Sequence, residues 1–238
     1  PAMTSAWRCR LHRDASPQEK EDTTGKLIVT EFVTLDGVAQ APGEPDEDRD
    51  GGFTHGGWQA PLLDQESGRV LFEQARSMDA LLLGRKTYEI FANYWPRAPE
   101  EIPFTSLLNG VPKYVASRTL AGPLAWQGST LVAEVLAESI TALKERHDEV
   151  HVIGSLDLVQ SLLRFGLVDR LNLWLYPLLL GSGKQVFADG TVPTALRLTE
   201  WVTYPNGTLQ LAYETAGVPT YGNLAIDEQD LQRLTGDD

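Results

Sequence analysis

The sequence contains one cysteine, Cys9, among 238 residues. A single cysteine cannot form an intramolecular disulfide or supply a thiolate zinc site. The four histidines, His12, His55, His147 and His151, are scattered without the spacing of metal ligands, and no HExxH motif occurs. We therefore expect neither a metal centre nor a disulfide-stabilised secreted fold.

The chain also lacks long apolar runs and an excess of positive charge. No run approaches the length of a membrane span, and the first residues lack a signal-peptide core, so we expect a cytoplasmic protein. The formal net charge is -13, from 20 Lys and Arg against 33 Asp and Glu. Binding a nucleic acid needs a basic stripe that this composition does not supply. We expect no membrane or nucleic-acid partner, and any phosphate site must be a local basic pocket.

The composition and its changes along the chain predict one domain with tails. Hydrophobic residues make up 42% of the sequence, which suits one α/β domain with a substantial core. Residues 1–25 are polar without hydrophobic period, which predicts a disordered or loosely attached extension. Residues 26–215 form the expected domain. Residues 216–238 form an acidic tail, in which 227–231 is either a short helix or a solvated terminus.

The most informative stretch is 79–89. Residues 80–83 are apolar without alternation, which predicts a strand buried on both faces, as in a parallel sheet. Gly84 ends this strand, and Arg85, Lys86 and Thr87 begin a helix beside backbone N–H groups that lack intrahelical partners. These groups together suit an anion such as phosphate. The alternative is an ordinary turn followed by solvated cations.

Two further strand ends carry similar chemistry. Gly154 and Ser155 follow a predicted strand at 149–153 and begin an apolar-faced helix, so the arrangement of strand, glycine, hydroxyl and helix occurs twice. Ser117 and Arg118 follow a short strand beginning at 112, and ligands of open α/β sheets bind at such carboxyl ends. A plain turn is the alternative for each.

The remaining segments complete an alternation of strands and helices. A strand at 26–33 precedes an Asp-Gly turn, and two strands at 196–204 and 208–214 are joined by Asn206-Gly207, which predicts a hairpin. The loop at 41–58 is rich in glycine, proline and acid, and is either a lid over a pocket or a solvated insertion. Further helices are expected at 64–76 and 139–147, and further strands at 129–132 and 171–177.

The order of these elements resembles the dihydrofolate reductase fold. Within it, the chain looks like the C-terminal reductase domain of bifunctional riboflavin-biosynthesis proteins, over roughly residues 26–215. The motifs that carry the resemblance lie at 34–37, 83–89, 115–119, 152–155 and 180–187. The resemblance implies a three-layer α/β fold whose mostly parallel central sheet ends in an antiparallel hairpin.

The family resemblance also implies NADPH, bound across the carboxyl ends of the central strands. The helix start after Gly84 matches the family segment that holds cofactor phosphates, and the 117–118 strand end matches the family's 2′-phosphate site. The 154–156 turn matches the family's Gly-rich turn under the pyrophosphate and nicotinamide. The implied cofactor-binding residues are Gly84, Arg85, Lys86, Thr87, Ser117, Arg118, Gly154, Ser155 and Leu156.

We therefore expect an NADPH-dependent reductase of a small pyrimidine- or pterin-like substrate. Asp36 is the leading candidate for substrate contact, although an Asx turn with Gly37 would also explain it. Glu66 and Asp64 are further candidates, because folate reductases carry a carboxylate near the corresponding position. The alternatives are a non-catalytic nucleotide-binding protein of the same fold and a true dihydrofolate reductase. Apolar residues at 171–176 and 178–180 predict a homodimer.

Overall fold

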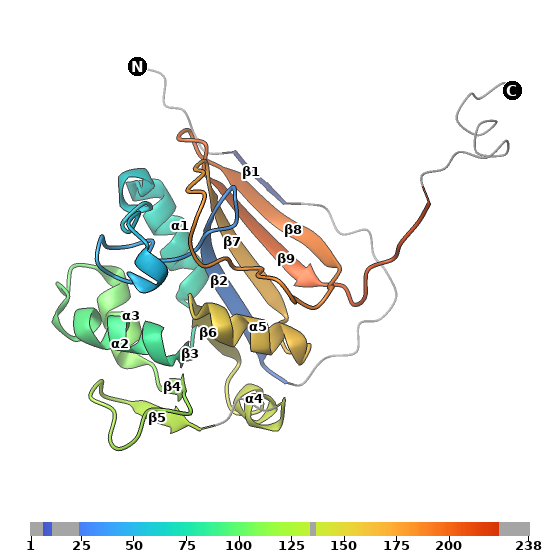
Figure 1. Cartoon of the computed structure of the whole chain (residues 1–238). Helices are drawn as coiled ribbons and strands as arrows, with labels where there is room; N and C mark the ends of the chain where they lie inside the picture. The colour runs from blue at the N-terminus through green and yellow to red at the C-terminus, as the bar shows by residue number, and fades with distance from the viewer. Residues whose placement is uncertain (1–6, 11–23, 134–136, 224–238) are drawn as a thin grey trace, which may run out of the picture.

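The computed structural model describes residues 7–10, 24–133 and 137–223, whose strands form one twisted sheet (Figure 1). The strands are β1 (Trp7–Arg10), β2 (Lys26–Thr34), β3 (Ala80–Gly84), β4 (Lys113–Ala116), β5 (Ser129–Val132), β6 (Glu149–Ile153), β7 (Arg170–Tyr176), β8 (Leu196–Thr203) and β9 (Leu209–Thr215). Their order across the sheet is β1-β8-β9-β7-β2-β6-β3-β4-β5.

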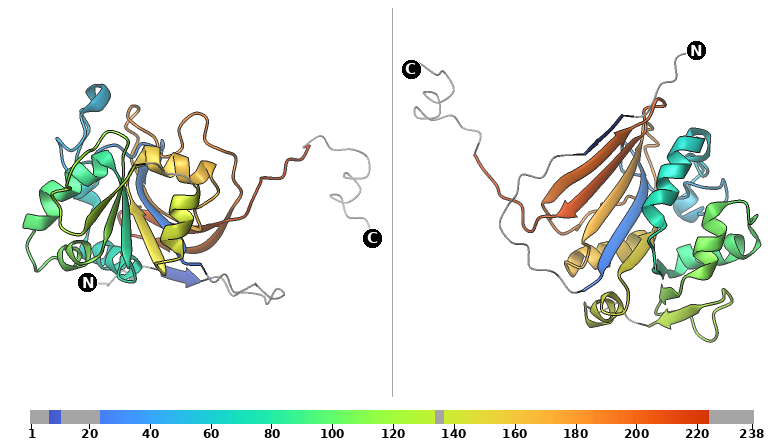
Figure 2. Two further views of the ribbon diagram at one scale, coloured as in Figure 1. Left: turned by 90° about the horizontal axis from the view of Figure 1, so that it is seen from below. Right: turned by 180° about the vertical axis from the view of Figure 1, so that it is seen from behind.

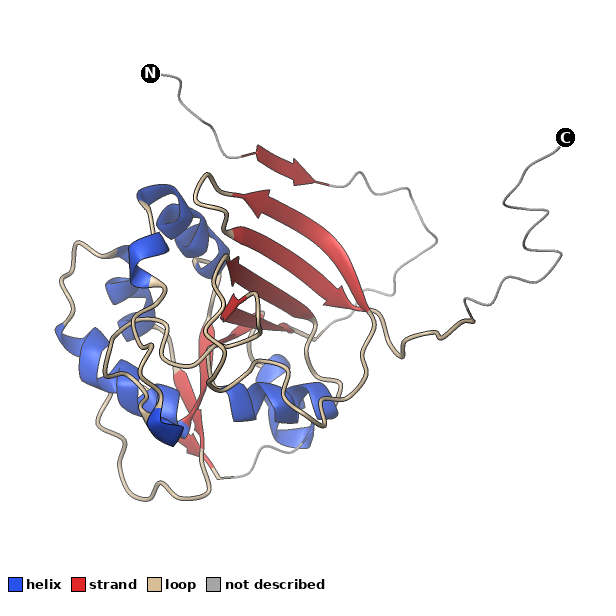
Figure 3. Ribbon diagram, turned by 45° about the horizontal axis from the view of Figure 1, so that its top comes forward, coloured by secondary structure: helices blue, strands red, loops and turns tan. Residues whose placement is uncertain are grey.

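The sheet combines a parallel part and an antiparallel part. Strands β7, β2, β6, β3, β4 and β5 pair in parallel. Strands β9, β8 and β1 extend the β7 edge in antiparallel pairings (Figure 3). The hairpin between β8 and β9 turns at Asn206-Gly207, where Gly207 has φ 86°. The predicted mostly parallel sheet with a C-terminal antiparallel hairpin is confirmed.

Helices cover both faces of the sheet (Figure 2). Helices α1, α2 and α3 contribute to the apolar cluster on one face, and α4 and α5 contribute to the cluster on the other. The helices are α1 (Gln65–Ala75), α2 (Arg85–Tyr94), α3 (Pro103–Gly110), α4 (Ala137–Lys144) and α5 (Leu156–Arg164), with short 3-10 turns at η1 (Asp50–Gly52), η2 (Ala60–Leu62) and η3 (Trp95–Arg97). The predicted three-layer arrangement is therefore present.

Strand β3 shows why an unbroken apolar run fits this position. Ala80 and Leu82 pack into the cluster that contains α4 and α5, whereas Leu81 and Leu83 pack into the cluster that contains α1, α2 and α3. All four residues are 0% exposed. Because successive side chains of a strand point to opposite faces, a strand covered on both sides needs apolar residues at every position.

The structure adds two elements that the sequence analysis did not predict. Helix α3 lies where we expected only a proline-containing connection; Pro103 occupies its first turn, and Leu108 is buried. Strand β1 lies within the predicted 1–25 extension and pairs with β8. The rest of that extension up to residue 23, apart from β1, and the predicted helix or terminus at 227–231 lie outside the described residues. The domain boundaries at 26 and 215 remain predictions.

Two glycines provide a test of the packing. A Cβ at Gly25 would lie 1.7 Å from the His147 carbonyl oxygen, whereas a Cβ at Gly68, inside α1, would meet no atom within 4 Å. We expect Gly25→Ala to lower the free energy of unfolding by about 3 kcal/mol or more, because the backbone must move. Gly68→Ala should raise it by about 0.5–1 kcal/mol, because alanine favours the helix. Urea unfolding measures both; equal stability of the two variants would contradict this packing.

Candidate active site

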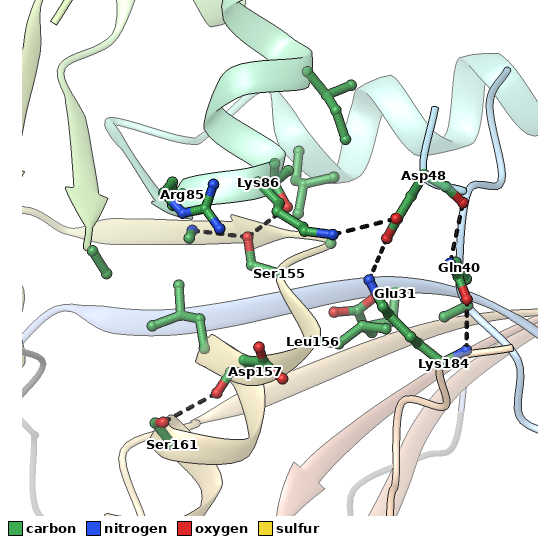
Figure 4. A pocket seen from close by; sticks show the side chains of 18 of the residues that line it. Glu31, Gln40, Asp48, Arg85, Lys86, Ser155, Leu156, Asp157, Ser161 and Lys184 are labelled. Carbon is green, nitrogen blue, oxygen red and sulfur yellow. Dashed lines mark hydrogen bonds and ion pairs between the residues drawn. The ribbon is translucent and has the colours of Figure 1, made fainter. Parts of the chain in front are cut away.

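A large cavity opens where the parallel strands end. It has a volume of about 940 Å³ and is bordered by β2, the starts of α2 and α5, the end of β4, and parts of the 39–48 loop. Figure 4 shows this site with the side chains that surround it. Carboxyl ends of parallel strands are the usual ligand-binding edge of an open α/β sheet, and the volume is in the range of small-molecule and cofactor sites.

The first turns of α2 and α5 adjoin each other inside this cavity. The backbone N–H of Gly84 donates to Ser155 Oγ at 2.8 Å, and Ser155 Oγ donates to Thr87 Oγ1 at 2.8 Å. A Cβ at Gly84 would lie 3.2 Å from the Ser155 side chain, so glycine permits this close approach. The hydroxyl of Ser155 thus joins two helix starts that are 71 positions apart in sequence.

Neither helix start has a side-chain cap among the described residues. First-turn N–H groups without such a cap remain available to water or to an anion. Gly154 and Ser155 have φ values of 70° and 69°, so two successive left-handed residues lead into α5. The Gly154 N–H also donates to the Thr30 carbonyl at 3.1 Å, which fixes this turn against β2. The two helix starts therefore form a rigid, electropositive corner.

Cationic side chains surround this corner. Arg85 pairs with Glu89 at 3.2 Å, and its side chain is 42% exposed. Arg118 follows β4, is exposed, and forms no ion pair with any residue that the structure describes. The cavity lining includes every predicted cofactor-binding residue: Gly84, Arg85, Lys86, Thr87, Ser117, Arg118, Gly154, Ser155 and Leu156. The structure thus brings these residues together, and cofactor binding by them remains a prediction.

The acidic 41–58 loop reaches the same corner through ion pairs. Lys86 pairs with Asp48 and Asp50, and Lys184 Nζ lies 2.6 Å from Asp48 and 3.0 Å from Asp50. Hydrogen bonds from Lys86 and Lys184 lower the pKa of Asp50 to about 2. Gln40 strengthens the arrangement, because its amide donates to the Asp48 and Asp50 carbonyls. The loop borders the cavity, as a lid would, and one predicted phosphate ligand, Lys86, is held by it.

The acids predicted to contact substrate lie elsewhere. Asp36 Oδ1 accepts from Thr34 Oγ1 at 2.5 Å, and Oδ2 accepts from the N–H groups of Leu180 and Gly181 at 2.9 and 2.6 Å. The Thr34 hydroxyl and the Gly181 N–H lower the pKa of Asp36. Asp36 is absent from the described lining of the cavity. It ties the turn after β2 to the segment after β7.

Asp64 and Glu66 border a separate small depression with Gln65 and Arg69. Asp64 caps α1, because its Oδ1 accepts from the Ser67 N–H at 2.7 Å while the Ser67 hydroxyl accepts from the Asp64 N–H at 3.0 Å. This capping box explains the acid at that position. The catalytic roles of Asp36, Asp64 and Glu66 remain predictions, and the geometry provides no contact between them and the large cavity.

The structure instead places Glu31 in the cavity lining. Glu31 lies on β2, is 2% exposed, and its Oε1 has no hydrogen-bond partner among the described residues. Burial raises its pKa to about 8. The sequence analysis missed it, although the available signal was an acid whose neighbours from Leu27 to Thr34 are all apolar or hydroxyl residues.

The sequence profile of the RibD C-terminal domain family matches residues 25–210. The chain belongs to this family. The resemblance inferred from the five motifs is therefore confirmed.

One curated protein is similar to this chain in sequence, and solved structures share its fold. The uncharacterized protein YyaP of Bacillus subtilis is 28% identical over 196 residues, which cover 81% of this chain and 96% of that protein. A putative riboflavin biosynthesis protein from Shewanella superposes with a TM-score of 0.58 at 20% identity, over 80% of this chain and 99% of that one. A pyrimidine reductase-like protein from Corynebacterium diphtheriae has a TM-score of 0.57 at 16% identity, over 81% and 92%. These structural likenesses show the shared fold.

Two absences complete the description. In the part of the chain that the structure describes, no helix is long and apolar enough to cross a membrane. Over the same residues, no group of three or more His, Cys, Asp or Glu side chains could hold a metal ion.

The ion pairs of the acidic loop can be tested directly. We expect the double substitution Asp48→Asn and Asp50→Asn to increase amide hydrogen exchange in residues 41–58 by roughly ten-fold, because both lysines lose their partners. Asp46→Asn is the matched control, since within the described residues Asp46 pairs only with exposed Arg49 in the same loop. Unchanged exchange in the double variant would show that these ion pairs do not hold the loop.

Proposed function

We propose that this member of the RibD C-terminal domain family is an NADPH-dependent reductase of a small pyrimidine- or pterin-like substrate. The observation that carries the proposal is the junction of two uncapped helix starts in one cavity, joined by the Ser155 hydroxyl. Such a corner suits a pyrophosphate, because it offers first-turn N–H groups from two helices at once.

The lining residues fit the remaining parts of this cofactor. Arg118 is exposed at the end of β4, and a guanidinium there suits a 2′-phosphate better than a ribose diol. Ser117 is next to it, and Leu156 offers an apolar surface at the start of α5. When bound, the reduced nicotinamide would supply the hydride. The chain itself would bind and orient both reactants and shield them from water.

The substrate class rests on the family and on the names of similar proteins. One structural neighbour is named as a pyrimidine reductase-like protein, and another as a putative riboflavin biosynthesis protein. Both names are consistent with a small heterocycle as substrate.

The predicted homodimer and cytoplasmic location also remain proposals. Leu179 is 75% exposed and is available to contact a second chain, whereas Trp174 and Tyr176 are buried within this one.

A charge substitution tests the cofactor assignment. We expect Arg118→Ala to weaken NADPH binding by ~10-fold and to leave NADH binding nearly unchanged, because only NADPH carries the 2′-phosphate. Arg76→Ala is the control, since Arg76 is an exposed arginine that pairs with Glu73 on α1, outside the cavity. Cofactor fluorescence during titration measures the six affinities, of the wild type and both variants for each cofactor.

The result also separates the alternatives. Equal loss of NADPH and NADH binding would argue against a 2′-phosphate site at Arg118, and no binding of either would refute the proposed cofactor. NADPH binding without oxidation in the presence of pterin and pyrimidine substrates would support the non-catalytic nucleotide-binding alternative. A failure to bind methotrexate would remove the folate reductase alternative.

A further inference from the structure

Glu31 lines the cavity from the sheet side. It lies on β2, the strand that crosses the site in Figure 4, and its backbone is paired with Leu173 of β7. The preceding residue, Thr30, accepts the hydrogen bond from the Gly154 N–H, so Glu31 lies directly beside the turn that begins α5. The carboxyl group is therefore placed next to the proposed cofactor corner, on a rigid central strand.

This carboxyl group lacks the partners that a buried acid normally has. Its Oε1 has no hydrogen bond, and no ion pair to Glu31 occurs within the described residues. An uncompensated buried polar group destabilises a protein by about 1–3 kcal/mol, and a buried charge by more. Buried polar atoms without partners are uncommon in folded proteins and often have a functional explanation.

The charged groups around Glu31 do not compensate for its burial. Val29 and Val33, which share its face of β2, and Leu173, its paired residue on β7, are uncharged. The charged groups that line the cavity from the other elements are Glu47 and Asp48 from the loop, Arg85 and Lys86 from α2, Arg118 after β4, Asp157 and Arg164 from α5, and Lys184 from the segment before β8. Arg85, Lys86 and Lys184 pair with other acids, and none of the five cations forms an ion pair with Glu31 among the described residues.

We propose that Glu31 is a catalytic acid, which hydrogen-bonds the substrate and donates a proton to the nitrogen or oxygen next to the carbon that is reduced. This inference rests on the proposed reductase function. A neutral Glu31 would also limit the class of substrate. A neutral carboxyl group both donates and accepts a hydrogen bond, so it fits a planar ring with a C=N or C=O group beside an N–H group.

The chemistry balances with a reduced nicotinamide as the two-electron donor. The substrate carbon gains a hydride, the π bond of C=N or C=O breaks, and the neighbouring nitrogen or oxygen takes the proton from the Glu31 carboxyl group. Glu31 is left as a carboxylate and regains a proton from water at the mouth of the cavity. Because burial raises the Glu31 pKa to about 8, the group holds its proton at neutral pH and loses it in alkaline solution.

The decisive variant is Glu31→Gln, which keeps the shape and the hydrogen-bonding groups but cannot donate the proton as an acid. We expect NADPH affinity to stay within about two-fold, while NADPH oxidation falls by roughly 100-fold or more. The probes are dihydrofolate and a ribosylaminopyrimidine phosphate. The wild-type rate should fall as the pH rises through about 8, whereas Glu31→Asp, which retains the acid, should recover part of the lost rate.

Two measurements on the protein alone accompany the kinetics. At neutral pH, the infrared spectrum of the wild type should contain a protonated carboxyl band that Glu31→Gln lacks and that disappears above about pH 8. The folded-state pKa is raised, so wild-type stability should decrease as the pH rises from about 4.5 to about 8. Glu31→Gln should therefore become more stable relative to the wild type over that interval.

The outcomes distinguish this inference from the proposed function. If the wild type oxidises NADPH and Glu31→Gln retains the rate and its pH profile, Glu31 is not the acid and the reductase function stands. An ionised Glu31 at neutral pH would overturn the inference in the same way. If the wild type binds no NADPH, or binds it and reduces neither probe, the proposed reductase function fails and the inference fails with it.

Discussion

The site depends on the hydroxyl of Ser155. By accepting from the Gly84 N–H and donating to Thr87 Oγ1, it holds the starts of α2 and α5 together at the carboxyl edge of the sheet. Ser155 adopts φ 69°, a left-handed conformation that costs a residue with a Cβ about 1–2 kcal/mol. Each of its two hydrogen bonds contributes about 0.5–1.5 kcal/mol, so they can offset that cost. Without this junction, the cavity would have two separate helix starts instead of one electropositive corner.

Two kinds of carboxyl group lie at the cavity: acids paired with lysines, and one buried acid without an ion pair among the described residues. Asp48 and Asp50 are paired with Lys86 and Lys184, so their charges hold the acidic loop beside the site. Among the residues that the structure describes, Glu31 has no such partner, and it lies on the central strand that lines the same cavity. This division gives the site an ionic rim and a buried acid whose pKa is raised to about 8. Although the chain has a net charge of -13, five cationic side chains line this one cavity: Arg85, Lys86, Arg118, Arg164 and Lys184.

Much of this structure could be predicted from local pattern. The apolar run at 80–83 predicted a strand covered on both faces, and glycine followed by hydroxyl or cationic residues predicted two helix starts that now line one cavity. Other features depend on contacts that the pattern does not show. Asp36 accepts from the distant Gly181 N–H and Asp64 from the Ser67 N–H three residues away, so each acid has a structural contact, while their catalytic roles remain predictions. Helix α3 begins at a proline that reads equally well as a loop residue. The pKa of Glu31 is raised because segments distant in sequence bury it, and the sequence of one strand does not show that burial.

A structure of the protein crystallised with NADPH would test the central claim most directly. The account predicts the pyrophosphate against the first-turn N–H groups of α2 and α5, on either side of the Ser155 hydroxyl, with the 2′-phosphate at Arg118 and the nicotinamide toward Glu31. A cofactor bound outside this cavity, or bound inside it with its phosphates away from both helix starts, would contradict the account.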